Sequence, residues 1–419
     1  MSHLDPHGND LGTALGRAMG ERADRLAPGT VDLDAVRGRA GAIRRRRRAT
    51  AAAGVLAAAA VLVPTGLVAG GVLDGGAERE RDLVAGREPG GREQVFTPAG
   101  EVEVDGFDDL PDGDPARVPY VSREGLVLPG VGPVDGVRMP QQAYAVSAGF
   151  LGTGILDGQA FLTVLDADGT PGEEVPLVAA QLVAAPAPLE QAAWIEPLGD
   201  DQRVVLADTA GADPTTEVAS WTVPGTQRVE LIGVGPQGVV AEVEGDEEGR
   251  TEPVVFAPGS EEPVAVDGLV GVAGVDPVTG RLAGTTSVSD DGSCSAVTGP
   301  EGGEPVWETC DWTLQGFSPD GRWISATQPY RSGYGDTVRA TLDGATGDVQ
   351  ASWRSTRDPE LQVTFSGYAW ESEDDQLAVL VQGLAGVVVR LSPDGAVEVV
   401  DRAALEENFG DFPFFLPLY

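Results

Sequence analysis

The sequence predicts an all-β outer domain, a β-propeller, preceded by short helices and one transmembrane helix. Three observations lead to this prediction. The chain holds 58 glycines and 31 prolines but only 6% aromatic residues, a composition typical of short strands joined by tight turns. A strand–turn–strand pattern recurs along the C-terminal part of the chain. A long uncharged segment follows five consecutive arginines near the N-terminus.

Residues 1–48 are expected to form a cytoplasmic helical tail. Apolar residues recur at helical spacing in "DLGTALGRAMGERADRLA" and in "VDLDAVRGRAGAIRRRRR", and "APGT" separates the two stretches. Two short amphipathic helices bury little surface by themselves. The segment is therefore interpreted either as a partly ordered tail beside the membrane or as a docking hairpin for a cytoplasmic partner.

Residues 49–70 are predicted to cross the cell membrane once. This stretch contains no ionisable side chain, and a helix of about 20 residues spans the hydrocarbon core. Arginine clusters next to a span stay on the cytoplasmic side. The residues that set the topology are therefore Arg44, Arg45, Arg46, Arg47 and Arg48. The Ala49–Gly70 helix would leave the N-terminus in the cytoplasm and the C-terminal domain extracytoplasmic.

The chain beyond the tail is strongly acidic. Residues 49–419 contain 18 arginines and 60 acidic residues, hence a net charge of -42, and they contain no lysine. A surface of this sign repels nucleic acid, so no nucleic-acid partner is expected. Residues 71–116 are charged and rich in glycine and proline, and they are predicted to form an extracytoplasmic stalk or linker.

Residues 117–419 are predicted to form the propeller. "LQGFSPDGRWISATQP" is typical of strand, turn and strand, and a second hairpin follows it, which gives four antiparallel strands in about 43 residues. First strands are expected near residues 142, 190, 229, 271, 314 and 364. The hairpin "RVPYVSREGLVLPGV" and the C-terminal "DFPFFLPLY" would together supply a seventh blade, with six blades as the alternative.

Two short motifs supply the turns of this repeat. Ser-Pro-Asp-Gly occurs at 318–321 and 392–395, and Asp-x-x-Thr-Gly occurs at 276–280 and 343–347. Proline presets the backbone of the second turn position, and glycine accepts the left-handed conformation at the exit. We therefore interpret these motifs as hairpin turns and not as binding motifs.

Cys294 and Cys310 are the only cysteines, and they flank one predicted hairpin symmetrically, with Trp307 facing Val297. This placement predicts a cross-strand disulfide, which the oxidising exterior of the cell permits. The seven tryptophans recur about once per blade. They are interpreted as packing between blades, and a carbohydrate-stacking surface is the alternative.

No catalytic, metal-binding or cofactor-binding residue is assigned, and no cofactor is expected. Both histidines, His3 and His7, lie in the tail, so the outer domain has no base for a Ser-His-Asp triad and no histidine ligand for zinc. "SDDGSCS" has the wrong spacing for a sialidase-type Asp box. "DADGTPGEE" lacks ligands that a calcium loop requires, and it is interpreted as a hairpin turn.

Two resemblances follow from these motifs. "FSPDGRWIS" resembles the strand–turn–strand of TolB-like and WD40-like propellers of bacterial envelopes, which implies the fold. "VRGRAGAIRRRRR", followed by one span and a β-rich domain, resembles membrane-bound anti-sigma and sensor proteins of high-GC Gram-positive bacteria. That resemblance implies a sigma-factor-like partner in the cytoplasm. The tail lacks the Cys-x-x-Cys of the zinc-binding subgroup, so such a role would be zinc-free.

The function expected from these features is that of a membrane-anchored, non-enzymatic binding platform for an unknown extracytoplasmic protein or glycan. A transmembrane sensor of the anti-sigma type is the first alternative. A carboxylate-based glycosidase is the second, and it requires two acids about 5–9 Å apart in a polar central pocket.

Overall fold

The computed structural model describes residues 100–404, except 123, 135–136, 138–139, 246–250, 290–291, 330–335, 356–362 and 383–384, together with Leu416. The chain divides into two units, Met1–Gly90 and Gly91–Tyr419, and every described residue belongs to the second. The predictions for the tail, for Arg44–Arg48 and for the span Ala49–Gly70 lie outside the described residues. None of the described residues forms a helix long and apolar enough to cross a membrane.

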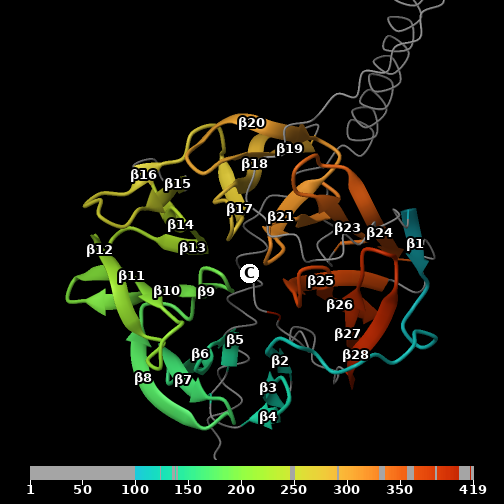
Figure 1. Ribbon diagram of the computed structural model, residues 1–419, viewed down its shortest axis with the longest axis horizontal. Coiled ribbons are helices and arrows are strands. Elements are labelled where there is room, and N and C mark those ends of the chain that lie inside the picture. Colours follow the sequence, from blue (N-terminus) through green and yellow to red (C-terminus); the bar gives the residue numbers. More distant parts are fainter. Residues whose placement is uncertain are drawn as a thin grey trace, which may run out of the picture. The chain divides into compact units, whose positions relative to one another are not determined.

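Seven sheets surround a common centre and form a seven-bladed β-propeller (Figure 1). The predicted all-β propeller is therefore confirmed, with seven blades instead of six. Blade 1 has three strands, β2 (Tyr120–Ser122), β3 (Gly125–Leu128) and β4 (Gly132–Val134). In the other six blades the first strand lies innermost and the fourth lies at the rim (Figure 1).

Blades 2 to 4 follow one another along the chain. Blade 2 consists of β5 (Pro140–Val146), β6 (Gly149–Leu156), β7 (Gln159–Asp166) and β8 (Pro171–Leu177). Blade 3 consists of β9 (Leu182–Ala185), β10 (Gln191–Leu198), β11 (Asp201–Asp208) and β12 (Thr216–Val223). Blade 4 consists of β13 (Val229–Gly235), β14 (Gly238–Glu244), β15 (Thr251–Phe256) and β16 (Val264–Ala265).

Blades 5 to 7 complete the ring. Blade 5 consists of β17 (Gly271–Val275), β18 (Leu282–Ser289), β19 (Gly292–Gly299) and β20 (Gly302–Thr309). Blade 6 consists of β21 (Thr313–Phe317), β22 (Trp323–Thr327), β23 (Val338–Asp343) and β24 (Val349–Ser355). Blade 7 consists of β25 (Val363–Trp370), β26 (Gln376–Gln382), β27 (Ala385–Leu391) and β28 (Val397–Ala404).

Five of the six predicted first strands begin within two residues of the expected position, and one prediction is wrong. The strand expected near 190 is β10, the second strand of blade 3, whereas the innermost strand is β9, which begins at Leu182. β9 has only four residues, and "PAPLE" separates it from β10. A strand this short shows too little alternation to be recognised before a proline-rich connection.

Blade 1 differs from the blade expected to combine both ends of the domain. All three of its described strands come from one continuous segment. Of "DFPFFLPLY", only Leu416 lies within the described residues, and it is buried beside Val118, Tyr120 and Ala369. The two ends of the domain therefore meet at the boundary between blades 1 and 7, where Leu416 contributes to the core.

Residues 100–116, which the sequence placed in the stalk, lie on the outer edges of blades 6 and 7. β1 (Gly100–Val104) pairs with β24 in parallel and adds a fifth strand to blade 6 (Figure 1). Further along, Asp112 forms a parallel bridge to Val399 of β28. The chain then enters β2. The segment thus joins two blades that are distant from it in sequence, which local composition does not show.

The turn and core predictions are confirmed. In all four turn motifs the last glycine donates its backbone N–H to the carbonyl of the first residue. Gly321 has a φ of 71°, and a Cβ there would lie 2.3 Å from the Oδ1 of Asp276 in blade 5, so both conformation and space require glycine. Five tryptophans are buried in the blades, namely Trp194, Trp221, Trp323, Trp353 and Trp370.

Candidate binding site at the centre of the ring

A cavity of about 160 Å³ lies where the innermost strands of several blades converge. β5, β9, β13 and β17 line it on one side, and Tyr368 of β25 lines it from blade 7. A second cavity, of about 10 Å³, lies near the C-terminal ends of the same strands and is enclosed by Phe317 and prolines 186, 277 and 319. The space at the centre is therefore wider and polar at one level, and narrow and apolar at the other.

The innermost strand of a blade has no strand on its central side, so its backbone N–H groups need other acceptors. Side chains of the preceding blade supply them. The Oε1 of Gln142 accepts the N–H of Leu182 at 2.9 Å, and the Oε1 of Gln181 accepts the N–H of Leu231 at 3.4 Å. In this way each glutamine links its own blade, or the segment just before it, to the next strand at the centre.

This use of the oxygens leaves the glutamine nitrogens available. Neither the Nε2 of Gln142 nor that of Gln181 donates to a described residue, and neither is sealed from solvent. A carboxamide nitrogen carries two N–H donors. Both glutamines line the cavity. The wall therefore presents donor groups whose positions are fixed by the backbone of the next strand.

Glu230 is the only charged residue in the lining of the 160 Å³ cavity. Its Oε2 lies 3.4 Å from the Nη2 of Arg228, and the two side chains are 47% and 73% exposed. An ion pair this exposed contributes little energy and is easily exchanged for another partner. The cavity thus combines amide donors with one carboxylate that accepts hydrogen bonds.

The opposite wall is rigid. The hydroxyl of Tyr368 accepts the N–H of Gly316 at 2.7 Å, and the guanidinium of buried Arg339 stacks 5.0 Å from the centre of the tyrosine ring. Arg339 in turn donates to Gln315 and Ser325. Buried polar groups that are connected in this way hold a single arrangement. Tyr368, which is 7% exposed, is therefore a fixed part of the cavity wall.

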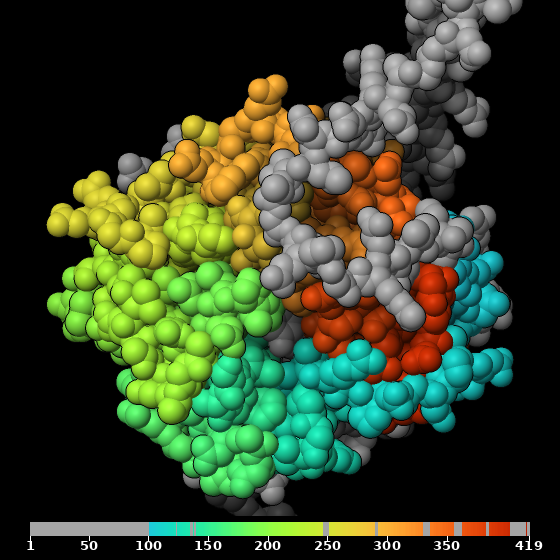
Figure 2. Space-filling view, in the orientation of Figure 1, coloured from blue at the N-terminus to red at the C-terminus, as the bar shows by residue number. Residues whose placement is uncertain are grey.

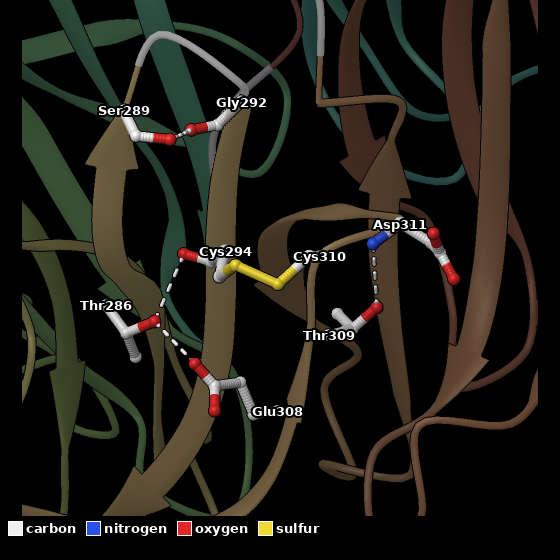
Figure 3. The surroundings of a disulfide bond; sticks show 8 residues. All are labelled: Thr286, Ser289, Gly292, Cys294, Glu308, Thr309, Cys310 and Asp311. Atoms are coloured by element: carbon white, nitrogen blue, oxygen red, sulfur yellow. Dashed lines mark hydrogen bonds between the residues drawn. A yellow bond between two sulfur atoms is a disulfide. The ribbon is translucent and has the colours of Figure 1, made fainter. Parts of the chain in front are cut away.

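The disulfide lies away from this cavity. Cys294 of β19 and Cys310, directly after β20, are bonded, with their Cα atoms 4.1 Å apart (Figure 3). The strands pair with Val297 opposite Trp307, as the sequence predicted. Nearby, the hydroxyl of Thr286 donates to Glu308 (Figure 3). The bond links the end of the rim strand of blade 5 to the neighbouring strand and therefore stabilises this sheet.

No sequence motif identifies Gln142, Gln181 or Glu230 as site residues. The available signal was polarity at the start of the innermost strands, in "PQQAYAV", "QLVAA" and "VELIGVG", where the neighbouring residues are apolar. That signal becomes meaningful only when the strands are known to lie innermost. For Gln181 it was lost because the first strand of blade 3 was expected near residue 190.

Comparison with known proteins concerns the fold. No protein-family model matches the chain, and no curated protein matches it. A structure from a study of two prolyl endopeptidases covers 70% of this chain at 15% identity with a TM-score of 0.46, and the match spans 48% of that protein's length. The β-propeller domain of the Trilobed protease from Pyrococcus furiosus covers 64% of this chain and 84% of its own length (12% identity, TM-score 0.41).

TolB from Acinetobacter baumannii is also similar, at 14% identity and a TM-score of 0.36. That match covers 59% of this chain and 63% of TolB. The seven-bladed β-propeller of this chain therefore resembles TolB and the propeller domain of the Trilobed protease in fold. At these identities the similarity describes the fold alone.

Proposed function

We propose that this protein is a membrane-anchored β-propeller that binds a ligand at the centre of its extracytoplasmic ring without catalysing a reaction. The observation that carries the proposal is the pair of glutamines, Gln142 and Gln181, whose oxygens are held by the next strand while their amide nitrogens line the cavity. Donors that are fixed before a ligand arrives cost little ordering entropy on binding. Together with Glu230 they suit a polar ligand that carries acceptor oxygens and at least one donor.

The composition of the cavity favours binding over hydrolysis. A carboxylate glycosidase uses two carboxyl groups about 5–9 Å apart, and Glu230 is the single acidic residue of the lining. The sequence has no histidine beyond His7 to activate a nucleophile in this domain. The membrane anchor rests on the arginines and the uncharged segment described above.

The test uses the full-length protein in detergent and exchanges one atom at a time. Gln142→Glu and Gln181→Glu keep an oxygen for the backbone N–H of Leu182 or Leu231 but remove both amide donors. Gln159→Glu, on the exposed start of β7, is the matched control for the added charge. Each protein is screened by thermal shift against soluble peptidoglycan fragments, oligosaccharides and short peptides.

We expect at least one compound to stabilise the wild type and the Gln159→Glu variant and to lose its effect in both cavity variants. Stabilisation that persists in both cavity variants, or the absence of any stabilising compound, would contradict a binding site at these residues. Turnover of a chromogenic glycoside that is lost in Glu230→Gln would instead identify a hydrolase.

A further inference from the structure

The rims of the blades differ in how their last strands are protected. A rim strand has unpaired backbone groups along its outer edge, which form a template for another strand. The rim strand of blade 6, β24, is covered by β1, and that of blade 7, β28, is met by residues 111–113. The N-terminal segment therefore covers two of the seven rims.

Most of the remaining rims are too short or are interrupted. β4 has three residues and β16 has two. β8 contains Pro171 and Pro176, and β20 contains Pro305. Proline has no N–H to donate, so these strands do not support a continuous ladder with a further strand. Such features are the usual protection of exposed edges.

β12 at the rim of blade 3 is neither this short nor interrupted by proline, and its one irregularity is a register shift against β11 between Glu217 and Ala219. It is eight residues long, contains no proline and is the outermost strand of its sheet (Figure 1). Between Glu217 and Val223, its backbone forms no hydrogen bond with any described residue outside the sheet. Val218 is 49% exposed on this strand. Figure 2 shows the yellow-green blade that contains β12 at the left rim of the ring.

Charge indicates which strand would suit this edge. On the covered rim, Glu101 of the added strand β1 pairs with Arg354 of β24 at 2.8 Å. On the open rim the charged residue of the last strand is Glu217, of the opposite sign, which is 42% exposed and pairs with Arg203 of β11 at 3.2 Å. Exposed acids also lie at both ends of β12, with Asp213 before the strand and Asp200 and Asp201 in the turn near Val223.

We propose that the outer edge of β12 binds an extended, lysine- or arginine-rich segment of a partner protein as a fifth strand of blade 3. The ladder of main-chain hydrogen bonds would supply affinity, and basic side chains near the exposed flanking acids Asp200, Asp201 and Asp213 would supply specificity. A second copy of this acidic chain would be repelled. The proposal is independent of the ligand at the centre, because β12 and the cavity are at opposite ends of the blade.

The probe is a synthetic peptide, Thr-Lys-Val-Lys-Val-Lys-Val-Thr, with a glutamate-for-lysine peptide as its counterpart. Binding to the full-length protein is measured by fluorescence anisotropy at 150 mM salt, and hydrogen exchange locates the site. Val218→Lys places a like charge on the open rim. Val306→Lys is the matched control, since Val306 is 55% exposed on β20, the rim strand that proline interrupts.

We expect the basic peptide to bind and to protect residues 216–223 from exchange, and the acidic peptide not to bind. Val218→Lys is expected to weaken binding at least tenfold, and Val306→Lys to leave it within twofold. The proposal is overturned if neither peptide binds, if both variants weaken binding equally, or if protection appears elsewhere. Binding without any protected strand would show a charge effect alone and would also overturn it.

Discussion

Two junctions between blades contain the same kind of contact, a buried carboxylate paired with an arginine, but differ in how the blades are otherwise connected. Between blades 5 and 6, buried Asp276 holds Arg281, which donates to the carbonyls of Gly321 and Gly344 in the next blade. Where the chain approaches blade 1 from the edge of blade 7, buried Glu371 holds Arg390, whose Nη2 lies within hydrogen-bonding distance of the carbonyls of Asp114 and Pro115, in the segment that leads into β2. In both cases a carboxylate orients an arginine toward backbone carbonyls of the neighbouring segment.

The junctions differ in what else connects the blades. The chain passes directly from β20 to β21, so blades 5 and 6 are joined covalently as well. Blades 7 and 1 are the last and the first, and no described strand is shared between them. Contacts there include the Arg390 cluster, the ion pair between Arg117 and Asp375, a hydrogen bond from the Tyr120 hydroxyl to Asp401 and the apolar cluster that includes Leu416.

The arginine contact therefore reinforces a covalent connection between blades 5 and 6, whereas between blades 7 and 1 it helps to close the ring. Tyr368 of blade 7 faces the cavity from the side opposite Gln142 and Gln181 of blades 2 and 3. The central site therefore depends on the closure, because a ring that opens between blades 7 and 1 separates its walls.

The largest effect is expected from Glu371→Ala. Removing this carboxylate leaves Arg390, whose side chain is 5% exposed, without its main partner, and breaking a buried pair from one side costs about 3–5 kcal/mol. The free energy of unfolding is measured by urea titration with tryptophan fluorescence. Glu398→Ala is the control, because Glu398 pairs with the same arginine but is 43% exposed and should change stability by less than about 1 kcal/mol. Equal losses in the two variants would contradict the closure.

An intermediate effect on the free energy of unfolding is expected when the disulfide of blade 5 is removed. The bond joins residues 16 apart, and in the chain-entropy model a loop of about 15 residues contributes ~3 kcal/mol. In Cys294→Ser/Cys310→Ser, we expect that loss in urea titration, with the largest acceleration of hydrogen exchange in β19 and β20. An unchanged free energy of unfolding would contradict this contribution.

The smallest effect concerns the closing junction at alkaline pH. Burial, together with the hydrogen bond to Asp401, raises the pKa of Tyr120 above its ordinary value of about 10. The protonated hydroxyl therefore contributes its full stability below about pH 10, and this contribution declines as the pH rises further. We expect wild type to exceed Tyr120→Phe by about 1.5 kcal/mol at pH 7, and the difference to shrink above pH 10. A difference that stays constant up to pH 11 would contradict this role.

The sequence predicted those features whose causes lie close together in the chain. Turn motifs fix the hairpins, and the spacing of Cys294 and Cys310 about one hairpin fixes their pairing. The junction between blades 7 and 1 was not predicted because its partners lie far apart in the sequence. Arg117 donates its backbone N–H to Glu371, 254 residues away, and β1 pairs with β24, which is similarly far along the chain. Gln142 and Gln181 acquire their role from strands of the next blade, which no local pattern identifies.

The most direct test of the closure is hydrogen exchange of the full-length protein, comparing wild type with Glu371→Ala and Asp276→Ala under native conditions. We expect Glu371→Ala to accelerate exchange in both β2–β4 and β25–β28, because the ring opens between them, and Asp276→Ala to accelerate it only around the turns of blades 5 and 6. If Glu371→Ala accelerates exchange in blade 7 alone and β2–β4 stay protected, then other contacts close the ring and Glu371 is not part of the closure.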